Sequence, residues 1–338
     1  MSASSFGSRF VVTTFGESHG TALGVVIDGC PANLNFDESL LKKELDRRRP
    51  GGELVSQRKE VDQPEVLSGV LEGKTLGTPI AIIVRNKDQK SQDYEQIKNS
   101  PRAGHADDVW QMKFGHRDHR GGGRSSGRET VARVMAGAVA QMLCQQLVPG
   151  IQLKAYSGQV GPYLLSEKER DQVWNQDVDS FTARFPSAQH EKVKELLTLA
   201  QAQGESYGGA AEIRIKGAPG GLGQPVFHKL KADLAQAYMS VGATSGVELG
   251  AGRDASAEKG TAFHHQSQSG NYGGIRGGIS TGEEIFFKVH FKPTSSILDI
   301  AKKGRHDPYI VTRAIPVLEA MTWIVLADHL LWVKTDRF

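Results

Sequence analysis

The sequence predicts an α+β fold in which helices and strands are mixed. Segments with helical periodicity and segments with strand patterns follow one another without the strict βαβ alternation of a doubly wound parallel sheet. Neither a composition shift nor a repeat of fixed period divides the 338 residues, so we expect a single domain over residues 1–338. Hydrophobic residues make up 38% of the chain, which is enough for a sizeable core.

The first half of the chain combines short strands with two helices. The expected strands are 9–16, 21–29 and 78–86. Asp37 is the expected N-cap of a helix that ends before Pro50. From Arg128 onward, apolar residues recur at the i, i+3, i+4, i+7 spacing of one helix face, which predicts a second and longer helix.

The second half continues the same mixture. Its expected strands are 151–161, 210–217 and 283–293, and its expected helices are 190–203, 227–240 and 313–334. The last helix is strongly apolar, and we place Pro316 in its first turn, where a missing N–H is tolerated. The stretch 250–282 is polar and rich in Gly and Ser, which is typical of a long mobile loop or of a functional lid.

Composition and charge exclude several functional classes. The net charge is only +3, whereas dedicated nucleic-acid-binding proteins usually carry a stronger basic excess. The two cysteines, Cys30 and Cys144, form no metal-binding or disulfide pattern. The N-terminal stretch has no apolar signal-peptide core, and no run approaches the ~20 apolar residues of a membrane span. We therefore expect a cytoplasmic protein that binds neither nucleic acid nor membrane.

Residues 115–130, GHRDHRGGGRSSGRET, form the most unusual stretch of the chain. The three glycines at 121–123 lead toward the expected helix, so backbone N–H groups and the positive end of the helix dipole would face a ligand. Arg124 and Arg128 add planar guanidinium groups that suit phosphate or carboxylate. The stretch is a candidate anion site, and a solvated basic turn is the alternative. Neither a Walker A loop nor a dinucleotide-binding glycine motif is present.

Further arginines lie at a helix end and in expected loops. Arg47, Arg48 and Arg49 end the first helix, where they either complement the helix dipole or bind a ligand. Arg102 and Arg305 lie in loops, where functional residues concentrate. Several arginine clusters on a nearly neutral chain predict a small substrate with more than one anionic group.

Three histidines in loops are candidates for acid–base work. His19 lies in the turn GESHG and His105 in GHAD. His306 immediately precedes Asp307. An unperturbed histidine pKa of about 6.5 suits proton transfer near neutrality. A zinc site is the alternative, but no HExxH, CxxC or HxH pattern is present, so no metal is expected. Residues 292–296, KPTSS, follow an expected strand and form a second candidate anion or cofactor site.

The sequence resembles the chorismate synthase family over almost its whole length. The matching motifs are GESHGTALGVVIDGCP (16–31), DRRRPG (46–51), SPRAGHAD (100–107), GGGRSSGRETVARVMAGAVA (121–140), GGIRGGIS (273–280), KPTSS (292–296) and RHDPYIVTRAIPVLEAM (305–321). Each is long, stands in the family's order and is rarely met by chance. Leu54, Ala103 and Tyr309 depart from the residues common in the family.

The resemblance implies a fold, a reaction and a cofactor. Family members form a β-α-β sandwich of helices packed between antiparallel sheets and assemble as homotetramers. They convert 5-enolpyruvylshikimate 3-phosphate to chorismate by 1,4-elimination of phosphate in aromatic amino acid biosynthesis. The reaction uses reduced FMN (FMNH2) with no net redox change. Some members reduce FMN themselves with NADPH. This chain has no nucleotide fingerprint, so we expect an external flavin reductase, with NADPH only an indirect reductant.

The resemblance also implies roles for individual residues. The expected catalytic residues are His19, which would protonate the departing phosphate, His105, which would stabilise the reduced flavin, and Asp307, which would relay the final proton. The expected substrate-binding residues are Ser18, Arg48, Arg102, Arg128 and Arg305. The expected FMN-binding residues are Arg124, Ser125, Ser126, Gly242, Ala243, Gly278, Lys292, Pro293, Thr294, Ser295, Ser296 and Arg305.

Two other functions remain as alternatives. A flavin-dependent oxidoreductase acting on a small anionic substrate would use the same anion sites but would consume NAD(P)H in every turnover. An anion-binding or RNA-binding protein without activity would show salt-sensitive binding to polyanions. The roles of His116, Arg117, His119 and Arg120 stay open among an entrance lining, a tetramer contact and a solvated turn.

Overall fold

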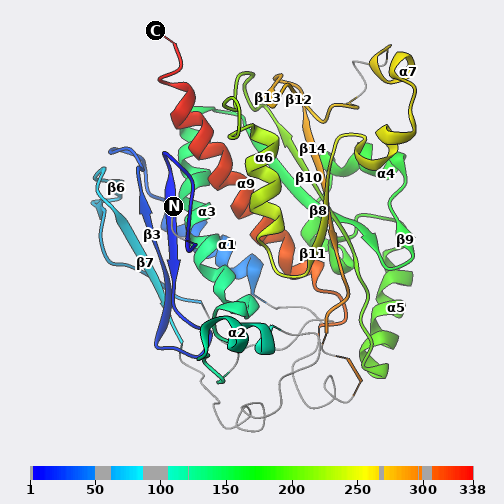
Figure 1. The fold of residues 1–338 in the computed structure, drawn as a ribbon, viewed down its shortest axis with the longest axis horizontal. Coiled ribbons are helices and arrows are strands. Elements are labelled where there is room, and N and C mark those ends of the chain that lie inside the picture. The colour runs from blue at the N-terminus through cyan, green and yellow to red at the C-terminus, as the bar shows by residue number, and fades with distance from the viewer. Residues whose placement is uncertain are drawn as a thin grey trace.

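Two antiparallel sheets enclose a layer of helices in this protein (Figure 1). The computed structural model describes residues 3–49, 62–86, 106–120, 122–265, 270–295, 297–298 and 307–337. The helices between the sheets are α1 (Glu38–Arg48), α3 (Thr130–Leu147), α6 (Leu230–Met239) and α9 (Val311–Val333). The expected α+β sandwich of helices packed between antiparallel sheets is therefore confirmed.

The first sheet has the strand order β1-β2-β3-β7-β4. Its strands are β1 (Ser5–Phe6), β2 (Val11–Phe15), β3 (Ala22–Asp28), β7 (Ile80–Arg85) and β4 (Pro64–Val66). Alternate residues such as Val25 and Ile82, which pair across β3 and β7, are fully buried toward the helix layer. The small hairpin of β5 (Val70–Leu71) and β6 (Lys74–Thr75) precedes β7.

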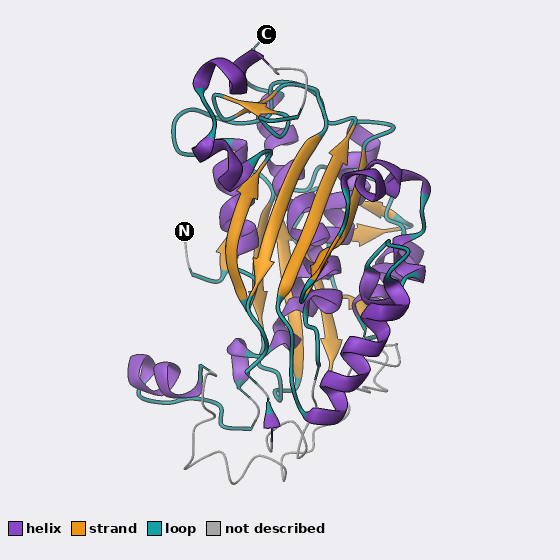
Figure 2. Ribbon diagram, turned by 90° about the vertical axis from the view of Figure 1, so that its right-hand side faces the viewer, coloured by secondary structure: helices purple, strands orange, loops and turns teal. Residues whose placement is uncertain are grey.

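The second sheet has the order β11-β14-β10-β8-β9, and Figure 2 shows it face on. Its strands are β11 (Thr244–Leu249), β14 (Ile285–Phe291), β10 (Gly209–Lys216), β8 (Gln152–Val160) and β9 (Tyr163–Leu164). On its outer face Glu212 is fully buried and accepts hydrogen bonds from Tyr156 Oη (3.0 Å) and Arg170 Nε (2.9 Å). This pairing satisfies a carboxylate that would be costly to bury alone.

The remaining described helices lie around this frame. They are α2 (Asp107–Phe114), α4 (Glu167–Gln172), α5 (His190–Gln203) and α7 (Gly260–His265), with 3-10 turns at Gly123–Ser125, Gly127–Glu129, Val173–Asn175, Val178–Ser180, Thr182–Arg184 and Gly252–Ala257. The stretch 250–282 also contains the hairpin β12 (Ile275–Arg276) and β13 (Ile279–Ser280). That this stretch is mobile, and that the chain is a single domain, stay predictions.

Most expected elements are confirmed with small boundary shifts. Asp37 caps α1 as expected, because its carboxylate accepts hydrogen bonds from the backbone N–H groups of Ser39 and Leu40. The helix expected from Arg128 begins instead at Thr130, since the residues just before it form 3-10 turns.

The closing helix α9 is the central element of the core. It is long and apolar enough to cross a membrane, so the statement that no run approaches that length was wrong. However, 94% of its most apolar window is buried inside the protein, as expected of a core helix. Pro316 lies in the second turn rather than the first. The carbonyl of Thr312, which Pro316 cannot bond, accepts a hydrogen bond from Arg184 Nη1 at 2.9 Å.

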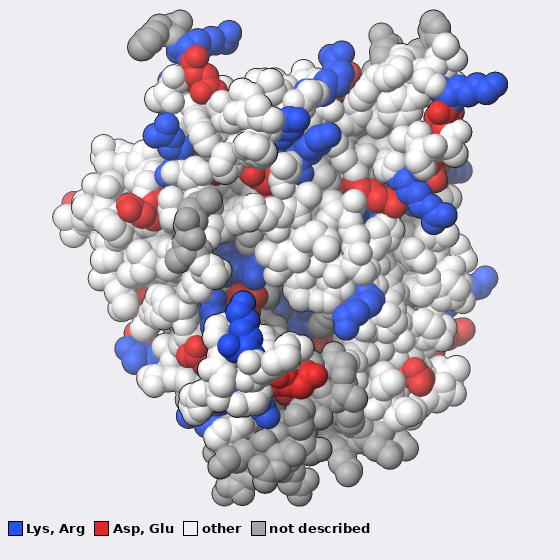
Figure 3. All heavy atoms as spheres, in the orientation of Figure 1, with Lys and Arg blue, Asp and Glu red and all other residues white. Residues whose placement is uncertain are grey.

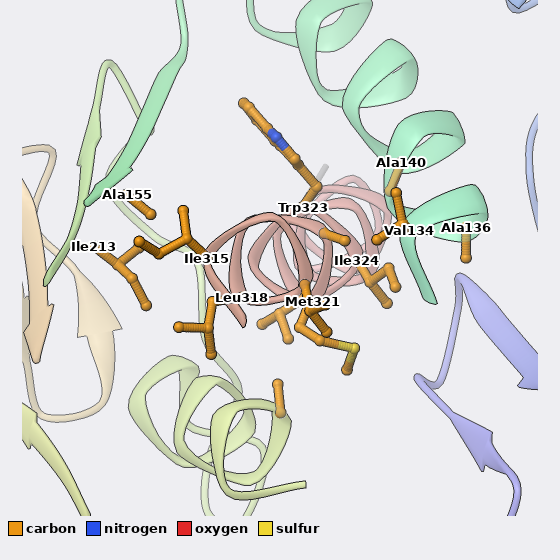
Figure 4. Packing of buried hydrophobic residues seen from close by; sticks show 14 of the residues in the cluster. Val134, Ala136, Ala140, Ala155, Ile213, Ile315, Leu318, Met321, Trp323 and Ile324 are labelled. Atoms are coloured by element: carbon orange, nitrogen blue, oxygen red, sulfur yellow. The ribbon is translucent and has the colours of Figure 1, made fainter. Parts of the chain in front are cut away.

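Helices α3 and α9 pack closely against each other. A Cβ built on Gly137 of α3 would come within 2.4 Å of both Cα and Cβ of Ala320 on α9, so only glycine permits this approach. Figure 4 shows α9 between Ala136 and Ala140 of α3 on one side and Ile213 of β10 on the other. The two sheets and the helix layer therefore share one hydrophobic cluster.

We expect Gly137→Ala to destabilise the protein, although alanine favours helices over glycine by about 1 kcal/mol. The added methyl group overlaps Ala320 and forces the helices apart, and such overpacking costs ~1–3 kcal/mol. The measurement is the midpoint of thermal unfolding. Gly260→Ala at the start of α7 is the matched control, because the nearest atom to its Cβ is His264 Cδ2 at 3.9 Å. A Gly137→Ala midpoint at or above that of the control would contradict the close-packing argument.

Candidate active site

The turn between β2 and β3 holds two of the expected site residues in a buried position. Ser18 is 3% exposed and His19 is 7% exposed, with Ser18 Oγ 3.0 Å from His19 Nδ1. Gly16 opens the turn with φ +93°, and a Cβ there would lie 2.2 Å from the carbonyl oxygen of Ala22. Glycine at this position therefore allows the tight turn that fixes the imidazole ring.

Asn86, which directly follows β7, connects this turn to Arg128. Its Nδ2 donates to the carbonyl oxygen of Gly20 (2.7 Å), and its backbone N–H donates to that of Thr21 (3.1 Å). Its Oδ1 accepts hydrogen bonds from Nε and Nη2 of Arg128, both at 3.3 Å. The structure thereby brings together the segments of His19 and Arg128, two residues that the resemblance places in one site. No sequence pattern pointed to Asn86.

Two expected substrate-binding arginines share one carboxylate. Asp62 accepts hydrogen bonds from Arg48 Nη1 at 3.2 Å and from Arg128 Nη1. Both arginine side chains are 4% exposed and the Asp62 side chain is 3% exposed. Burial lowers the pKa of Arg48, the Asp62 carboxylate opposes that shift, and the positive charges of Arg313 and Arg128 add to it. Asp62 was also missed, because it stands in a polar stretch without a motif.

Arg48 is the last residue of α1 and contacts the beginning of α3. Its Nε donates to Thr130 Oγ1 (2.9 Å) and its Nη2 to the carbonyl oxygen of Gly127 (2.9 Å). Ser126 caps the same turn, since its hydroxyl accepts a hydrogen bond from the backbone N–H of Arg128 (3.3 Å). The N-terminus of α3, where an anion is favoured electrostatically, therefore lies at the arginine pair.

The glycine-rich stretch folds into a compact loop on the end of β2. Gly122 has φ +88°, and Ser125 Oγ donates to its carbonyl oxygen at 2.6 Å. Arg124 Nη2 donates to Thr14 Oγ1 (2.6 Å) and its Nη1 to the carbonyl oxygen of Gly16 (3.2 Å). The Arg124 side chain thus fixes the loop beside the turn that carries the buried imidazole.

A cavity of about 480 Å³ lies between this loop and α2. Trp110 and Phe114 of α2 line one side, with ring centroids 5.1 Å apart, and residues 116–120 and 122–125 line the other. The side chains whose role the sequence left open, His116, Arg117, His119 and Arg120, are therefore cavity residues. Figure 3 shows Lys and Arg atoms inside a recess of this face, close to the position of α2 in Figure 1.

An ion pair between Asp118 and Arg120 lines the cavity. Asp118 Oδ1 accepts from Arg120 Nε at 2.8 Å, and this hydrogen bond is the largest cause that lowers the pKa of Asp118, with a smaller contribution from nearby His19. The volume falls in the range of small-molecule sites, and its aromatic and cationic lining suits a flat ring system with an anionic tail. Among the described residues, no three His, Cys, Asp or Glu side chains are grouped to hold a metal ion.

The second expected anion segment follows β14 and meets the start of α9. The backbone N–H of Lys292 donates to the carbonyl oxygen of Ala243 (3.0 Å), and Thr294 Oγ1 donates to that of Asp307 (3.3 Å). The Asp307 carboxylate accepts from Arg313 Nη1 at 2.7 Å. Residues 242–243, 292–295 and 307 are therefore brought together, and Arg313 is a member that sequence reasoning missed.

Gly278 lies apart from the other expected FMN-binding residues of the chain. Its carbonyl oxygen accepts from the backbone N–H of Leu230 at 2.8 Å, at the first residue of α6. Gly242 follows the other end of this helix, whose 10 residues span ~15 Å. Figure 1 places the β12–β13 hairpin at the end of the molecule opposite α2.

Several expected positions lie outside the residues that the structure describes: His105, Arg102, Arg305, Ser296, Leu54 and Ala103. Their roles stay predictions. Tyr309, the third departure from the family pattern, is buried, and its hydroxyl donates to the carbonyl oxygen of Gln159 at 2.7 Å. Its ring packs against Gly209, where a Cβ would lie 2.8 Å from Tyr309 Cε2.

Comparisons with known proteins agree with one another. The family model described as chorismate synthase matches residues 10–331. The chorismate synthase of Bdellovibrio bacteriovorus is 69% identical over 100% of both chains, and that of Opitutus terrae is 44% identical over 98% of this chain and 96% of its own. A crystal structure of chorismate synthase matches with a TM-score of 0.79 and 31% identity, covering 98% of this chain and 94% of that one. The resemblance is confirmed: the chain belongs to the chorismate synthase family and is a carbon–oxygen lyase of the shikimate pathway.

Proposed function

We propose that the protein eliminates phosphate from 5-enolpyruvylshikimate 3-phosphate to give chorismate, with reduced FMN as its cofactor. The observation that carries this proposal is the buried arginine pair, Arg48 and Arg128, linked through Asn86 to the turn of His19. A substrate with a phosphate and two carboxylates requires cations held out of water beside a proton donor. Family membership supports the same reaction.

In this mechanism Arg128 binds a substrate anion at the beginning of α3, with Ser18 adding a hydroxyl donor. His19 gives a proton from its imidazole ring to the departing phosphate, which neutralises charge on the leaving group. The contact of Ser18 Oγ with His19 Nδ1 supports this role, because a partner on one ring nitrogen fixes the orientation of the ring. Arg102 and Arg305 would complete the anion site.

FMN would be held by residues 124–126, 242–243 and 292–296, with Arg305 beside them. The hydroxyl oxygens of Ser125 and Thr294 can accept hydrogen bonds from the ribityl hydroxyls of FMN, while their own protons bind the carbonyl oxygens of Gly122 and Asp307. When bound, reduced FMN supplies electron density to the reacting ring without net oxidation. His105 would stabilise the reduced flavin. The Asp307 carboxylate, oriented by Arg313, would relay the last proton.

We also propose a homotetramer located in the cytoplasm and supplied with reduced FMN by an external flavin reductase. The family resemblance supports the tetramer, and the absence of a dinucleotide-binding glycine motif from the sequence supports the external reductant. The position of Gly278 leaves two interpretations: it belongs to the site of another subunit, or it does not bind FMN.

Supplied with chemically reduced FMN under anaerobic conditions, the protein is expected to form chorismate and phosphate in equal amounts from 5-enolpyruvylshikimate 3-phosphate. Chorismate absorbance and released phosphate are the two measurements. No product with fully reduced flavin would overturn the proposed function. Consumption of one NAD(P)H per turnover would instead indicate the alternative flavin-dependent oxidoreductase.

With oxidised FMN and NADPH alone, we expect no turnover, because the sequence contains no dinucleotide-binding glycine motif. Addition of a separate flavin reductase should restore chorismate formation under the same anaerobic conditions. Sustained activity with NADPH and no reductase would show that the protein reduces FMN itself, and would refute the proposal of an external source.

His19→Ala should lower turnover by ~10²-fold or more if the imidazole is the proton donor to the leaving phosphate. His190→Ala is the matched control, because His190 lies at the start of α5 and is partly exposed. Binding of FMN, followed by its fluorescence, should stay unchanged in both variants. Turnover of His19→Ala close to that of the control would remove His19 from the mechanism without touching the family assignment.

A further inference from the structure

One buried arginine outside the expected site contacts the helix ends that carry two site residues. Arg184 closes the last of the 3-10 turns between α4 and α5, and its side chain is 10% exposed. Its Nη2 donates to the carbonyl oxygen of Arg47 (2.9 Å), its Nη1 donates to that of Thr312 (2.9 Å), and its Nε lies 2.8 Å from Asp179 Oδ1. The guanidinium group of Arg184 therefore joins α1 and α9 to its own segment.

Both carbonyl oxygens need a donor from outside their own helix. Arg47 is in the last turn of α1, where carbonyl groups have no partner within the helix. Thr312 is in the first turn of α9, and the residue four positions on is Pro316, which has no N–H. A guanidinium group is planar and its two terminal nitrogens have a fixed spacing. Arg184 therefore holds the end of one helix in a fixed position against the beginning of the other.

The residues that follow these two carbonyl groups belong to the site. Arg48 comes directly after Arg47, and Arg313 comes directly after Thr312. Burial is the main cause that lowers the pKa of Arg48, and the positive charge of Arg313 adds to it, so the two guanidinium groups are near each other. Arg313 in turn donates to the Asp307 carboxylate at 2.7 Å. The placement of α1 against α9 thus decides where two cations of the site lie.

The backbone that presents Arg184 is strained. Ala183 and Arg184 have φ +55° and +53°, in the left-handed region that residues other than glycine rarely adopt. Neighbouring groups hold this conformation: Ser157 Oγ of β8 donates to the carbonyl oxygen of Ala183 at 2.6 Å. Strained residues cluster at functional sites, because the surrounding structure must compensate for their cost. Here the strained turn brings the side chain of Arg184 between the two helix ends.

We propose that Arg184 is a positioning residue that acts on the substrate through Arg48, by fixing the end of α1 against the beginning of α9. This inference rests on the proposed function, in which the arginine pair of Arg48 and Arg128 binds a substrate anion. The competing interpretation is that Arg184 only stabilises the fold by satisfying two buried carbonyl groups. A purely structural Arg184 would change the free energy of unfolding and leave the affinity for substrate unchanged.

The first test is Arg184→Lys, which keeps the charge and an aliphatic stem. An ammonium group is a single point, so it cannot reproduce the planar contacts with both carbonyl oxygens and with Asp179. The dissociation constant of 5-enolpyruvylshikimate 3-phosphate is measured by calorimetry with oxidised FMN bound, a state in which we expect no elimination. We expect the affinity to fall ~10-fold or more, since small displacements of a binding group are costly.

Arg170→Lys is the matched control for this test. Arg170 forms a similar ion pair, with Nε 2.9 Å from Oε1 of the fully buried Glu212, but on the outer face of the second sheet. We expect this variant to lower the thermal midpoint and to keep the substrate affinity of the wild type. A folded Arg184→Lys variant that binds substrate as tightly as Arg170→Lys would overturn the proposal.

A double-mutant cycle with Arg48→Lys asks whether Arg184 acts through Arg48. In the Arg48→Lys background, Arg184→Lys should weaken substrate binding much less than in the native background, because the guanidinium group that it positions is gone. Equal losses in the two backgrounds would show that Arg184 acts independently of Arg48, and would refute the proposal.

If Arg184→Lys does not fold, as judged by circular dichroism, Asp179→Asn supplies the test instead. The Asp179 side chain is 35% exposed and its carboxylate contacts Nε of both Arg184 and Arg47, each at 2.8 Å. Loss of its charge therefore loosens Arg184 at a smaller cost to the fold. The proposal predicts weaker substrate binding in Asp179→Asn as well, and unchanged binding would contradict it.

Failure of this inference is distinguishable from failure of the proposed function. A wild-type protein that neither binds 5-enolpyruvylshikimate 3-phosphate nor converts it to chorismate with reduced FMN refutes the proposed function. A wild-type protein that does both, while Arg184→Lys binds the substrate equally well, refutes only the positioning role of Arg184.

Discussion

The contact of Gly137 with Ala320 sets the geometry on which the rest of the structure depends. It lets α3 and α9 approach more closely than side chains would allow, in the centre of the layer between the two sheets. Arg313, in the first turn of α9, is close enough to Arg48 to lower its pKa, and Arg48 itself touches the first residue of α3. The N-termini of two core helices therefore meet at one place, and their dipoles favour an anion there.

This arrangement explains how the core can tolerate several buried charged side chains. Asp62 neutralises part of the positive charge of the arginine pair, and Asp307 pairs with Arg313 at the start of α9. The remaining positive charge would attract the substrate of the proposed function, which carries several anionic groups. Because protein acceptors hold these arginines in place, the proposed reaction would need little reorganisation of the site.

Local sequence patterns predicted a helix or strand well where contacts between residues close in the sequence determine it. The Asp37 cap and the apolar face of α3 depend only on neighbours along the chain, and both are confirmed. The beginning of α3 was placed too early because Ser126 caps a 3-10 turn before the helix proper, and the hydrophobic period does not distinguish the two. Asp62 and Asn86 carry no local pattern, because their printed hydrogen-bond partners lie 14 to 69 residues away in the sequence. The family resemblance named the expected FMN-binding residues, but it did not predict that Gly278 and Gly242 lie at opposite ends of α6.

The choice of an amide at position 86 follows from the two groups it connects. Its Nδ2 faces carbonyl oxygens of the turn that carries His19, and its Oδ1 faces the guanidinium of Arg128. Only this orientation of the amide satisfies both sides, because carbonyls accept and guanidinium groups donate. A carboxylate at 86 would still bind Arg128, but it would repel the carbonyl of Gly20 and add a second negative charge beside Asp62. The amide therefore connects the turn of His19 to Arg128 without changing the net charge beside the arginine pair.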